Sequence, residues 1–402
     1  MNDTEKSSLE TTEAKGMTSV PPKTTKPEEN KEPIPFTDSA TGQYSQGFNS
    51  QPNTTAGNTN QSNQNTAGEY GFTRQWTAVS PLRDRDVMTL GNAVGFPLSM
   101  FFVLNIVFQI LLSYILYIIS AITGRTSFPE LSDPNIQYIY SSCVTIFTLT
   151  VPYLFTLKAT NSAYSDLVSV KRVSGSSCLA FVMLGLGASV LCNLASNTLG
   201  YYSDKLFGIK FINSAPEYEK GLWSFALMLL CVGILPAILE EFAIRGVILG
   251  ALRKKFSDTS AIVISSVLFG LLHGNLQQIP FAALLGLLLG FATVYTGSII
   301  PAVLIHAVNN INTVVISFAI PTLSPLAQNV VYFTFIAVSL IIGLCGFITL
   351  IKSDPDIFRL STEKSELTSG NLFSFLSSPW IIIFLALCVL EVLLVQGVIS
   401  LV

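Results

Sequence analysis

The chain has 402 residues, of which 50% are hydrophobic and 12% are charged, and its formal net charge is −3. Soluble domains carry about 25% charged residues, so this composition excludes an ordinary soluble protein and indicates a polytopic membrane protein. The small negative charge, without a basic block, argues against a nucleic-acid-binding protein. The chain contains 2 histidines, so any imidazole chemistry must use His273, His306 or both.

The charged residues are distributed unevenly along the chain. Residues 1–86 hold 8 of the 22 Lys and Arg residues and 11 of the 25 Asp and Glu residues. This segment is rich in Thr, Ser, Asn, Gln and Pro, and it contains too little apolar surface to offset the entropy that is lost on ordering. We therefore expect residues 1–86 to form a disordered cytoplasmic tail and residues 87–402 to form a transmembrane helical domain.

Long apolar segments follow this tail. A helix that crosses the bilayer needs about 20 mostly apolar residues, and this criterion predicts an all-α, polytopic integral membrane protein with about eight or nine transmembrane helices. The fifth of the expected helices is short, so it could be a broken or re-entrant element. The helices are expected near 93–122, 135–157, 176–200, 221–249, 259–273, 276–296, 299–319, 326–351 and 379–400.

The charges of the expected loops predict an orientation. If the N-terminus is cytoplasmic and every helix crosses, the inner loops hold most of the Lys and Arg residues, as the positive-inside rule requires. We therefore expect a multi-pass protein of the plasma membrane with a cytoplasmic N-terminus. The inner-loop cations are Lys158, Lys171, Arg172, Arg253, Lys254, Lys255, Lys352, Arg359 and Lys364, and the outer-loop cations are Arg125, Lys205, Lys210 and Lys220.

Ionisable side chains inside apolar helices are energetically costly and are usually functional. Glu241 and Arg245 are four positions apart and share a helix face, so they are suited to an ion pair. Glu240 lies about 100° around the helix from Glu241 and needs another partner. Pro236 is expected to kink this helix just upstream. The ionisable side chains within the expected helices are Glu240, Glu241, Arg245, His273, His306 and Glu391.

Two further segments, FGLLH at 269–273 and HAVNN at 306–310, place polar or aromatic side chains four positions apart. From the rise of a helix, Glu240 lies roughly 20 Å, His273 about 22 Å and His306 about 14 Å from the inner surface. These overlapping depths predict a shared cavity. A carboxylate with a neutral imidazole can deprotonate water, and a second imidazole with a carboxamide can donate hydrogen bonds to an oxyanion. Such a set is suited to amide hydrolysis by water, without a nucleophilic Ser or Cys.

The segments EEFAIR at 240–245, FGLLH at 269–273 and HAVNN at 306–310 resemble the three motifs of the CPBP family. This family, also called Abi, comprises CAAX prenyl proteases and bacteriocin-processing intramembrane glutamic endopeptidases. The resemblance covers about residues 222–315, and three ordered motifs on membrane helices are a specific signal. It implies an intramembrane endopeptidase whose substrate is a peptide or a membrane-protein segment, with or without a lipid group.

The resemblance also implies a role for each motif residue. Glu240 and His273 would activate the attacking water. His306 and Asn310 would form the oxyanion hole. The supporting residues that it implies are Glu241 and Arg245.

We expect no metal cofactor, because the zinc motif HExxH is absent and the resemblance is to glutamic proteases. Zinc is the alternative, since the family is also described in places as metal-dependent. Two imidazoles and a carboxylate are ordinary zinc ligands, and Glu240, His273 and His306 would supply them.

Two other classes of function remain open. A non-catalytic membrane scaffold, or a bacteriocin-immunity or peptide-binding protein, could retain the motifs as architecture. A transporter would also place charges in mid-membrane, but it would usually show paired repeats with broken helices, and the sequence has no clear internal repeat. The motifs of zinc site-2, aspartyl and rhomboid intramembrane proteases are absent from the sequence.

Three residues or pairs near these motifs have expected structural roles. Gly286 and Gly290 have the spacing of a GxxxG motif and predict a close contact between helices. Phe269 is expected to pack on His273 and fix its rotamer. Glu391 lies outside the motifs and is expected to contact another helix or a partner.

Overall fold

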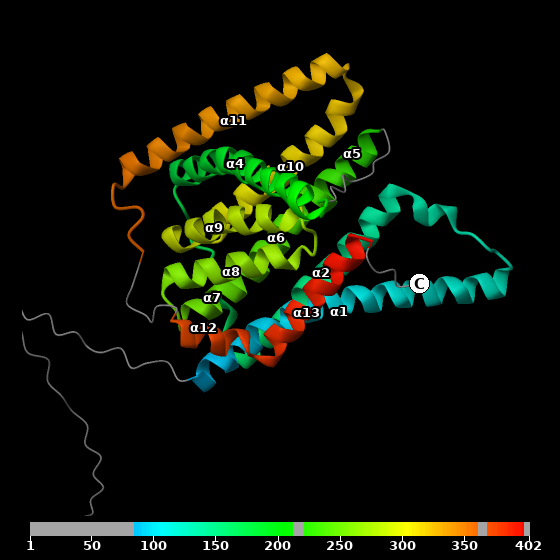
Figure 1. Cartoon of the computed structure of the whole chain (residues 1–402), viewed down its shortest axis with the longest axis horizontal. Coiled ribbons are helices and arrows are strands. Elements are labelled where there is room, and N and C mark those ends of the chain that lie inside the picture. Colours follow the sequence, from blue (N-terminus) through cyan, green and yellow to red (C-terminus); the bar gives the residue numbers. More distant parts are fainter. Residues whose placement is uncertain (1–83, 212–220, 361–367, 398–402) are drawn as a thin grey trace, which may run out of the picture. The chain divides into compact units, whose positions relative to one another are not determined.

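The computed structural model describes residues 84–211, 221–360 and 368–397, and within them the fold is helical, with a single isolated bridge between Val170 and Ser298 (Figure 1). The all-α prediction is confirmed. The expected tail falls outside the described residues, except for its last three positions. The elements are α1 (Asp84–Thr123), η1 (Pro129–Ser132), α2 (Pro134–Ala159), α3 (Tyr164–Leu167), α4 (Gly175–Phe207), α5 (Leu222–Met228), η2 (Leu229–Ile234), α6 (Leu235–Glu241), η3 (Phe242–Ile248), α7 (Leu249–Arg253), α8 (Asp258–Leu272), α9 (Gln278–Thr296), α10 (Ile300–Ala319), η4 (Ile320–Thr322), α11 (Pro325–Ser353), α12 (Ser369–Leu376) and α13 (Pro379–Val395).

Local sequence signals mark where many of these helices begin and end. The side chains of Ser174, Ser257 and Ser324 accept hydrogen bonds from backbone N–H groups at the starts of α4, α8 and α11. Such caps satisfy donors that have no partner within the helix. Gly208 and Gly297 follow α4 and α9 in the left-handed conformation, which glycine adopts without strain.

Seven of the described helical segments are long and apolar enough to cross a membrane. An eighth is formed if α12 and α13, which are bent by 68° relative to each other, count as one span. The prediction of a multi-pass membrane protein is therefore confirmed. The helix expected at 259–273 is the short α8, with 15 residues. The first helix begins at Asp84, earlier than the expected residue 93, because the charged residues before the apolar segment also adopt helical conformation.

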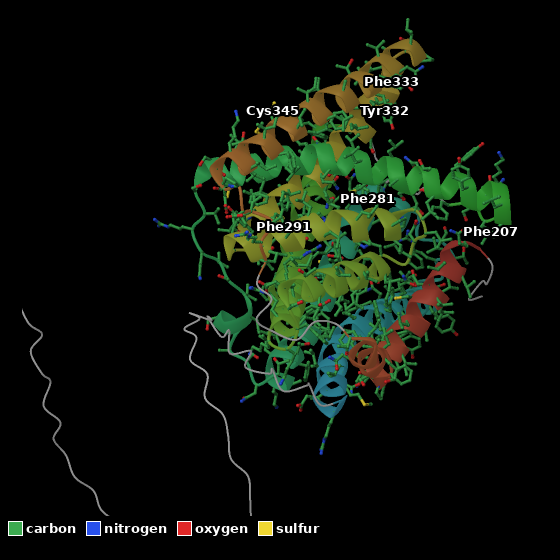
Figure 2. All side chains as sticks on the ribbon, turned by 60° about the vertical axis from the view of Figure 1, so that its left-hand side comes forward. Phe207, Phe281, Phe291, Tyr332, Phe333 and Cys345 are labelled. Atoms are coloured by element: carbon green, nitrogen blue, oxygen red, sulfur yellow. The ribbon has the colours of Figure 1, made fainter. Side chains whose placement is uncertain are left out.

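Large apolar side chains are exposed on the outer helices. Tyr332, Phe333 and Cys345 lie along α11, and Phe207 lies at the end of α4 (Figure 2). Phe333 is 67% exposed and Phe207 is 75% exposed. Contiguous apolar surface of this kind is unfavourable in water and favourable in lipid, as expected for membrane helices.

The connections that alternation predicts on one side of the membrane contact one another. Ser169, before α4, donates from Oγ to the carbonyl of Gly297, between α9 and α10, at 2.5 Å. Tyr295 on α9 donates to the Asp354 carboxylate, just after α11, at 2.9 Å. Lys254, after α7, donates to the hydroxyl of Ser162. These contacts bring together four connections that lie on one side of the membrane if each of the nine expected helices crosses it.

Small residues allow the helices to approach closely. A Cβ added at Gly187 of α4 would lie 2.8 Å from the Cα of Gly343 in α11, so a larger residue would separate the two backbones. The short α8 packs on α9, and α10 packs on α4, α6 and α9. As a result, the helices that carry the three motifs are neighbours in the structure.

Candidate functional site

The helical segment from α5 to α7 carries the first motif, and its backbone is irregular on both sides of the two glutamates. The segments η2 and η3 are π-helical, and α6, between them, ends at Glu241. Pro236 is the second residue of α6, just after η2, and it lacks the N–H that a regular helix would use there. The backbone irregularity expected near Pro236 takes the form of a π segment, a feature that is common at functional sites.

Glu241 is at the centre of a buried hydrogen-bond network. Its Oε1 accepts from Arg245 Nη1 at 2.8 Å and from His306 Nδ1 at 2.8 Å. The side chains of Glu241 and Arg245 are fully buried, and their expected ion pair is confirmed. Because a carboxylate paired with arginine is an acceptor, His306 carries a proton on Nδ1, and its Nε2 is left for another partner.

Glu240, the neighbouring carboxylate, lies in a more open position. Its side chain is 19% exposed, and its Oε2 is 3.9 Å from His306 Nε2. This separation is longer than a hydrogen bond, and Glu240 Oε2 has no hydrogen-bond partner among the described residues. The resemblance implies that Glu240 and His273 share a water. In the described residues these two side chains make no direct hydrogen bond or ion pair, and the polar neighbour of Glu240 is His306.

The ring of Phe269 contacts three of the predicted site residues. Its centroid lies 4.9 Å from that of His273 and 5.8 Å from that of His306, both in edge-to-face geometry. Arg245 Cζ lies 4.2 Å from the same centroid. His273 Nδ1 is 2.9 Å from the Phe269 carbonyl oxygen. Since a carbonyl can only accept, His273 donates from Nδ1 and its Nε2 is unprotonated in the neutral ring. The expected packing of Phe269 on His273 is confirmed.

The turn after α8 is fixed by close contacts. His273 follows Leu272, the last residue of α8, and Gly274 has a φ of +60°, in the left-handed region. A Cβ added at Gly274 would collide with the side chain of Glu391 on α13. Glu391 therefore packs against the turn that carries His273, just after the end of α8.

Asn310 lies one helical turn after His306 on α10. Its Oδ1 accepts from Asn309 Nδ2 at 3.1 Å. Within the described residues the Nδ2 group of Asn310 has no hydrogen-bond partner, so it is available as a donor on the same helix face as His306.

The glycine pair and one tyrosine complete the surroundings of the site. A Cβ at Gly286 would lie 3.0 Å from Arg245 Nη2, and one at Gly290 would lie 3.1 Å from Ile262 Cγ2, so the expected close contact is confirmed. The Gly286 carbonyl accepts from Arg245 Nη2 at 3.3 Å. Tyr153 on α2 is fully buried, and its hydroxyl has no hydrogen-bond partner among the described residues. No motif includes Tyr153, although a phenol inside an apolar span is a visible signal in the sequence.

The described residues do not form a converged zinc site. Tetrahedral zinc needs three protein ligands converging at about 2.0–2.2 Å from one point. In the described residues no group of three His, Cys, Asp or Glu side chains is arranged to hold a metal ion. Glu240 Oε2 and His306 Nε2 are neighbouring atoms, and His273 Nδ1 bonds to the Phe269 carbonyl, which leaves its Nε2 as the atom that could bind a metal. The zinc alternative therefore stays a prediction.

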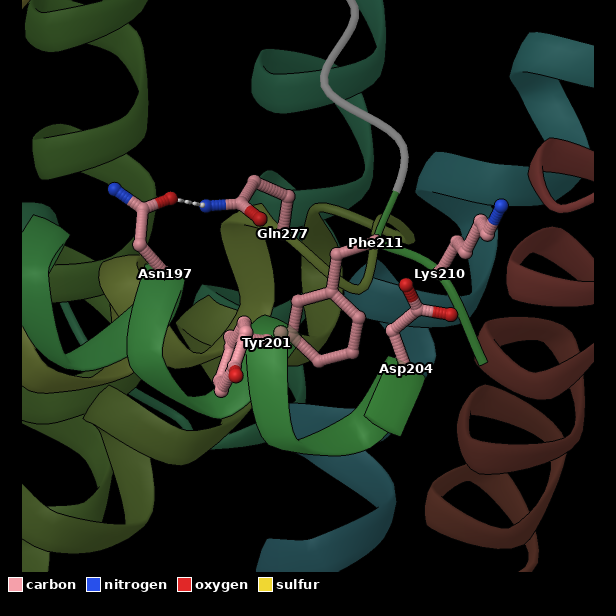
Figure 3. A pocket seen from close by; sticks show the side chains of 7 residues that line it. Asn197, Tyr201, Asp204, Lys210, Phe211 and Gln277 are labelled. Carbon is pink, nitrogen blue, oxygen red and sulfur yellow. Dashed lines mark hydrogen bonds between the residues drawn. The ribbon is translucent and has the colours of Figure 1, made fainter. Parts of the chain in front are cut away.

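A separate cavity of about 370 Å³ lies at the C-terminal end of α4 (Figure 3). Gln277 closes one side of it, donating from Nε2 to Asn197 Oδ1 at 2.7 Å, and its carbonyl accepts from Ser196 Oγ at 2.6 Å. No motif residue lines the cavity, which adjoins the turn between α8 and α9. Its lining residues are Asn197, Gly200, Tyr201, Asp204, Lys210, Phe211 and Gln277.

Residues 222–312 match the family model described as type II CAAX prenyl endopeptidase Rce1-like. These residues form an Rce1-like domain. The match begins at α5, ends within α10 and includes all three motifs, so the resemblance inferred from the motifs is confirmed. No curated protein and no solved structure matches the chain.

The Rce1-like domain supports a CAAX-type intramembrane peptidase, and this family implies peptide substrates and a membrane environment. The domain covers less than a quarter of the chain. The helices α1, α2, α11 and α13 lie outside the matched residues, although α2 packs on α6 and η3, and α13 packs on α8.

Proposed function

We propose that the chain is an intramembrane endopeptidase that hydrolyses a peptide bond with water activated by Glu240. The observation that carries this proposal is that the two ring nitrogens of His306 face different glutamates. Its Nδ1 is bonded to Glu241, while its Nε2 faces Glu240 Oε2 across 3.9 Å. Because these two atoms do not bond to each other, Glu240 Oε2 can bind the attacking water, and His306 Nε2 can donate to an oxyanion that forms beside it.

The reaction begins with proton transfer from this water to Glu240. The water oxygen forms a bond to the carbonyl carbon of the substrate, and the carbonyl becomes an oxyanion. His273 Nε2 accepts the second hydrogen bond of the water, because its Nδ1 proton is held by the Phe269 carbonyl. The Nε2–H of protonated His306 and the Nδ2–H of Asn310 donate to the oxyanion.

The tetrahedral intermediate then collapses. The C–N bond breaks, and Glu240 returns the proton to the leaving nitrogen, so that one water is consumed and an acid and an amine are released.

The charges of the site support a protonated His306 in this mechanism. Ionised Glu240 and Glu241 with Arg245 give a net charge of −1 in a buried region. Uncompensated buried charge is unfavourable, and one imidazolium brings the sum to zero. His306 lies next to both carboxylates, at 2.8 Å from Glu241 and 3.9 Å from Glu240.

We further propose a multi-pass orientation with a cytoplasmic N-terminus in a plasma membrane. The distribution of Lys and Arg between alternating loops supports this orientation. The substrate class is a peptide or membrane-protein segment that reaches the helices from the bilayer. A C-terminal CAAX peptide with a prenylated cysteine is the first probe to use, because it is the substrate class named by the matching family.

The proposed function is tested by trapping a substrate on Glu240→Gln. Membranes that contain this variant or the wild type are solubilised, and bound peptides are identified by mass spectrometry. We expect an intact peptide on the variant and its two fragments with the wild type. Equal biological activity of both proteins would overturn the protease function and favour a scaffold. Equal cleavage by both would overturn the activation of water by Glu240. Proteoliposome uptake that is lost in Glu240→Gln without any peptide product would favour a transporter.

Metal-free chemistry is part of the proposal and has its own test. We expect cleavage to be insensitive to EDTA and 1,10-phenanthroline, and we expect the purified active protein to hold no stoichiometric zinc. Loss of activity with a chelator, restored by zinc, would overturn this part of the mechanism.

A further inference from the structure

Tyr153 is a buried polar residue that the proposed reaction has not yet used. Its side chain has 0% exposure, and its hydroxyl has no hydrogen-bond partner among the described residues. A buried hydroxyl without a partner is unfavourable, because it has lost its hydrogen bonds to water. A native structure that retains such a group usually does so for a reason, such as a ligand or a catalytic role.

The helix that carries Tyr153 packs on the segments that form the first motif. Tyr153 lies on α2, which contacts α6, where Glu240 and Glu241 lie, and η3, which follows them. Glu240 Oε2 is also buried without a hydrogen-bond partner among the described residues, so each of the two helices in contact, α2 and α6, carries a buried polar atom of this kind.

We propose that Tyr153 is a further residue of the catalytic site, and that its phenol donates a hydrogen bond to the water that Glu240 activates. This inference rests on the proposed function. A water molecule has four hydrogen-bonding positions. Donation to Glu240 Oε2 and to His273 Nε2 uses its two protons, and acceptance from Tyr153 uses one lone pair. The remaining lone pair points to the substrate carbonyl, as nucleophilic attack requires.

This arrangement assigns each proton in the first step. One proton moves from the water to Glu240 as the new C–O bond forms. The phenol keeps its proton throughout, so Tyr153 holds the nucleophile in place and does not act as an acid or base. A residue with this function affects kcat more than KM, because the peptide is bound by other groups.

The charged and titratable groups around the proposed water come from several elements. Glu240 and Glu241 lie on α6, Arg245 on η3 and His306 on α10, and His273 follows α8. The helix α2 contributes Tyr153 alone among the residues named for the site. It lies outside the Rce1-like match, so the catalytic site extends beyond the matched domain.

The test is Tyr153→Phe, which removes the hydroxyl and keeps the ring that packs in the core. Tyr140→Phe is the matched control, since Tyr140 lies on the same helix and also has a buried hydroxyl without a partner among the described residues. Cleavage is measured with the peptide trapped on Glu240→Gln, or with an internally quenched prenyl-CAAX peptide. We expect Tyr153→Phe to lower kcat by about 10- to 100-fold with KM and melting temperature unchanged, which corresponds to a barrier higher by about 1.4 to 2.7 kcal/mol. Tyr140→Phe should match the wild type.

The outcomes separate this inference from the proposed function. If the wild type cleaves and Glu240→Gln does not, but Tyr153→Phe and Tyr140→Phe have the same kcat, the role of Tyr153 is overturned alone. A rise in KM with unchanged kcat would likewise overturn it. If wild type and Glu240→Gln cleave equally, the proposed function itself fails. Should Tyr153→Phe not fold, 3-fluorotyrosine and 4-fluorophenylalanine at position 153 provide a pair of similar size, with and without the hydroxyl. We then expect only the first to retain wild-type kcat.

Discussion

Glu240 and Glu241 are neighbours in the chain with the same side chain, yet they lie in two different regions of the site. Glu241 is fully buried and shares one oxygen between Arg245 and His306. Glu240 is 19% exposed, and its Oε2 has no hydrogen-bond partner among the described residues. Glu241 Oε2 also has no hydrogen-bond partner among the described residues, so the two residues differ in exposure and in the bonds of Oε1. The difference indicates that Glu241 stabilises the arrangement of the site through Arg245 and His306, whereas Glu240 lies in a more open position for chemistry. Each substitution below tests this division between structure and chemistry.

The largest expected effect is a loss of kcat on substitution of Glu240, the carboxylate proposed to act in the reaction. Glu240→Gln removes the base but keeps the shape of the side chain, so we expect kcat to fall by about 10³- to 10⁴-fold. The melting temperature should remain that of the wild type, since no described hydrogen bond of Oε2 is lost. Peptide cleavage and thermal unfolding in detergent measure both quantities. A large loss of folding stability in Glu240→Gln would indicate that Glu240 has a structural role instead.

Glu241→Gln tests the opposite region. It leaves the fully buried Arg245 without its charged partner, and breaking a buried ion pair costs about 3–5 kcal/mol of folding stability. The control is Glu241→Leu with Arg245→Leu, which removes both charges and should recover much of the melting temperature. We expect this double variant to remain inactive, because His306 has lost its acceptor. A single variant as stable as the wild type would contradict the structural role of Glu241.

Asn310→Ala tests whether a side chain of α10 also takes part in the reaction. The loss of one oxyanion donor lowers kcat by about 10²- to 10³-fold in enzymes of this mechanistic type, and we expect that range here with little change in KM. Asn309→Ala is the control, because it removes only the hydrogen bond to Asn310 Oδ1. Equal effects of the two substitutions on kcat would argue against a direct role of Asn310.

The smallest expected effect is at the turn that carries His273. Gly274→Ala introduces left-handed strain and a collision with Glu391, so it should destabilise the protein by about 1–3 kcal/mol and lower kcat. Gly297→Ala has a similar φ of +63° without a close contact, so it reports the strain alone. Glu391→Ala in the Gly274→Ala background should relieve the collision. If Gly274→Ala and Gly297→Ala behave alike, the contact with Glu391 has no bearing on His273.

Much of the architecture was predictable from the sequence, because apolar length and periodic spacing act locally. The helices and their order, the Glu241–Arg245 pair and the close approach at Gly286 and Gly290 all follow from spacing along a helix. The division of α12 from α13 was not predicted, although Pro379 stands at the bend. The direction of this bend depends on how α12 and α13 pack against α1, and no local sequence pattern encodes that packing.

The site was predictable in its members but not in all of its partners. The motifs identify Glu240, His273 and His306, yet spacing within a helix cannot show which atoms meet between helices. The hydrogen bond from His306 to Glu241, the π segments around α6 and the buried hydroxyl of Tyr153 depend on tertiary packing. Tyr153 lies 87 positions before Glu240 in the sequence, and only the fold packs the helix of one, α2, on the helix of the other, α6.

The position of Phe269 has a consequence for how this site can vary. One ring contacts Arg245 from the first motif, His273 from the second and His306 from the third. A change in the size of that ring alters the packing of all three at once. The three motifs are therefore not independent modules. A substitution in one motif that moves the Phe269 ring must be matched by substitutions in the other two motifs. This requirement limits the ways in which such a site can evolve a new specificity.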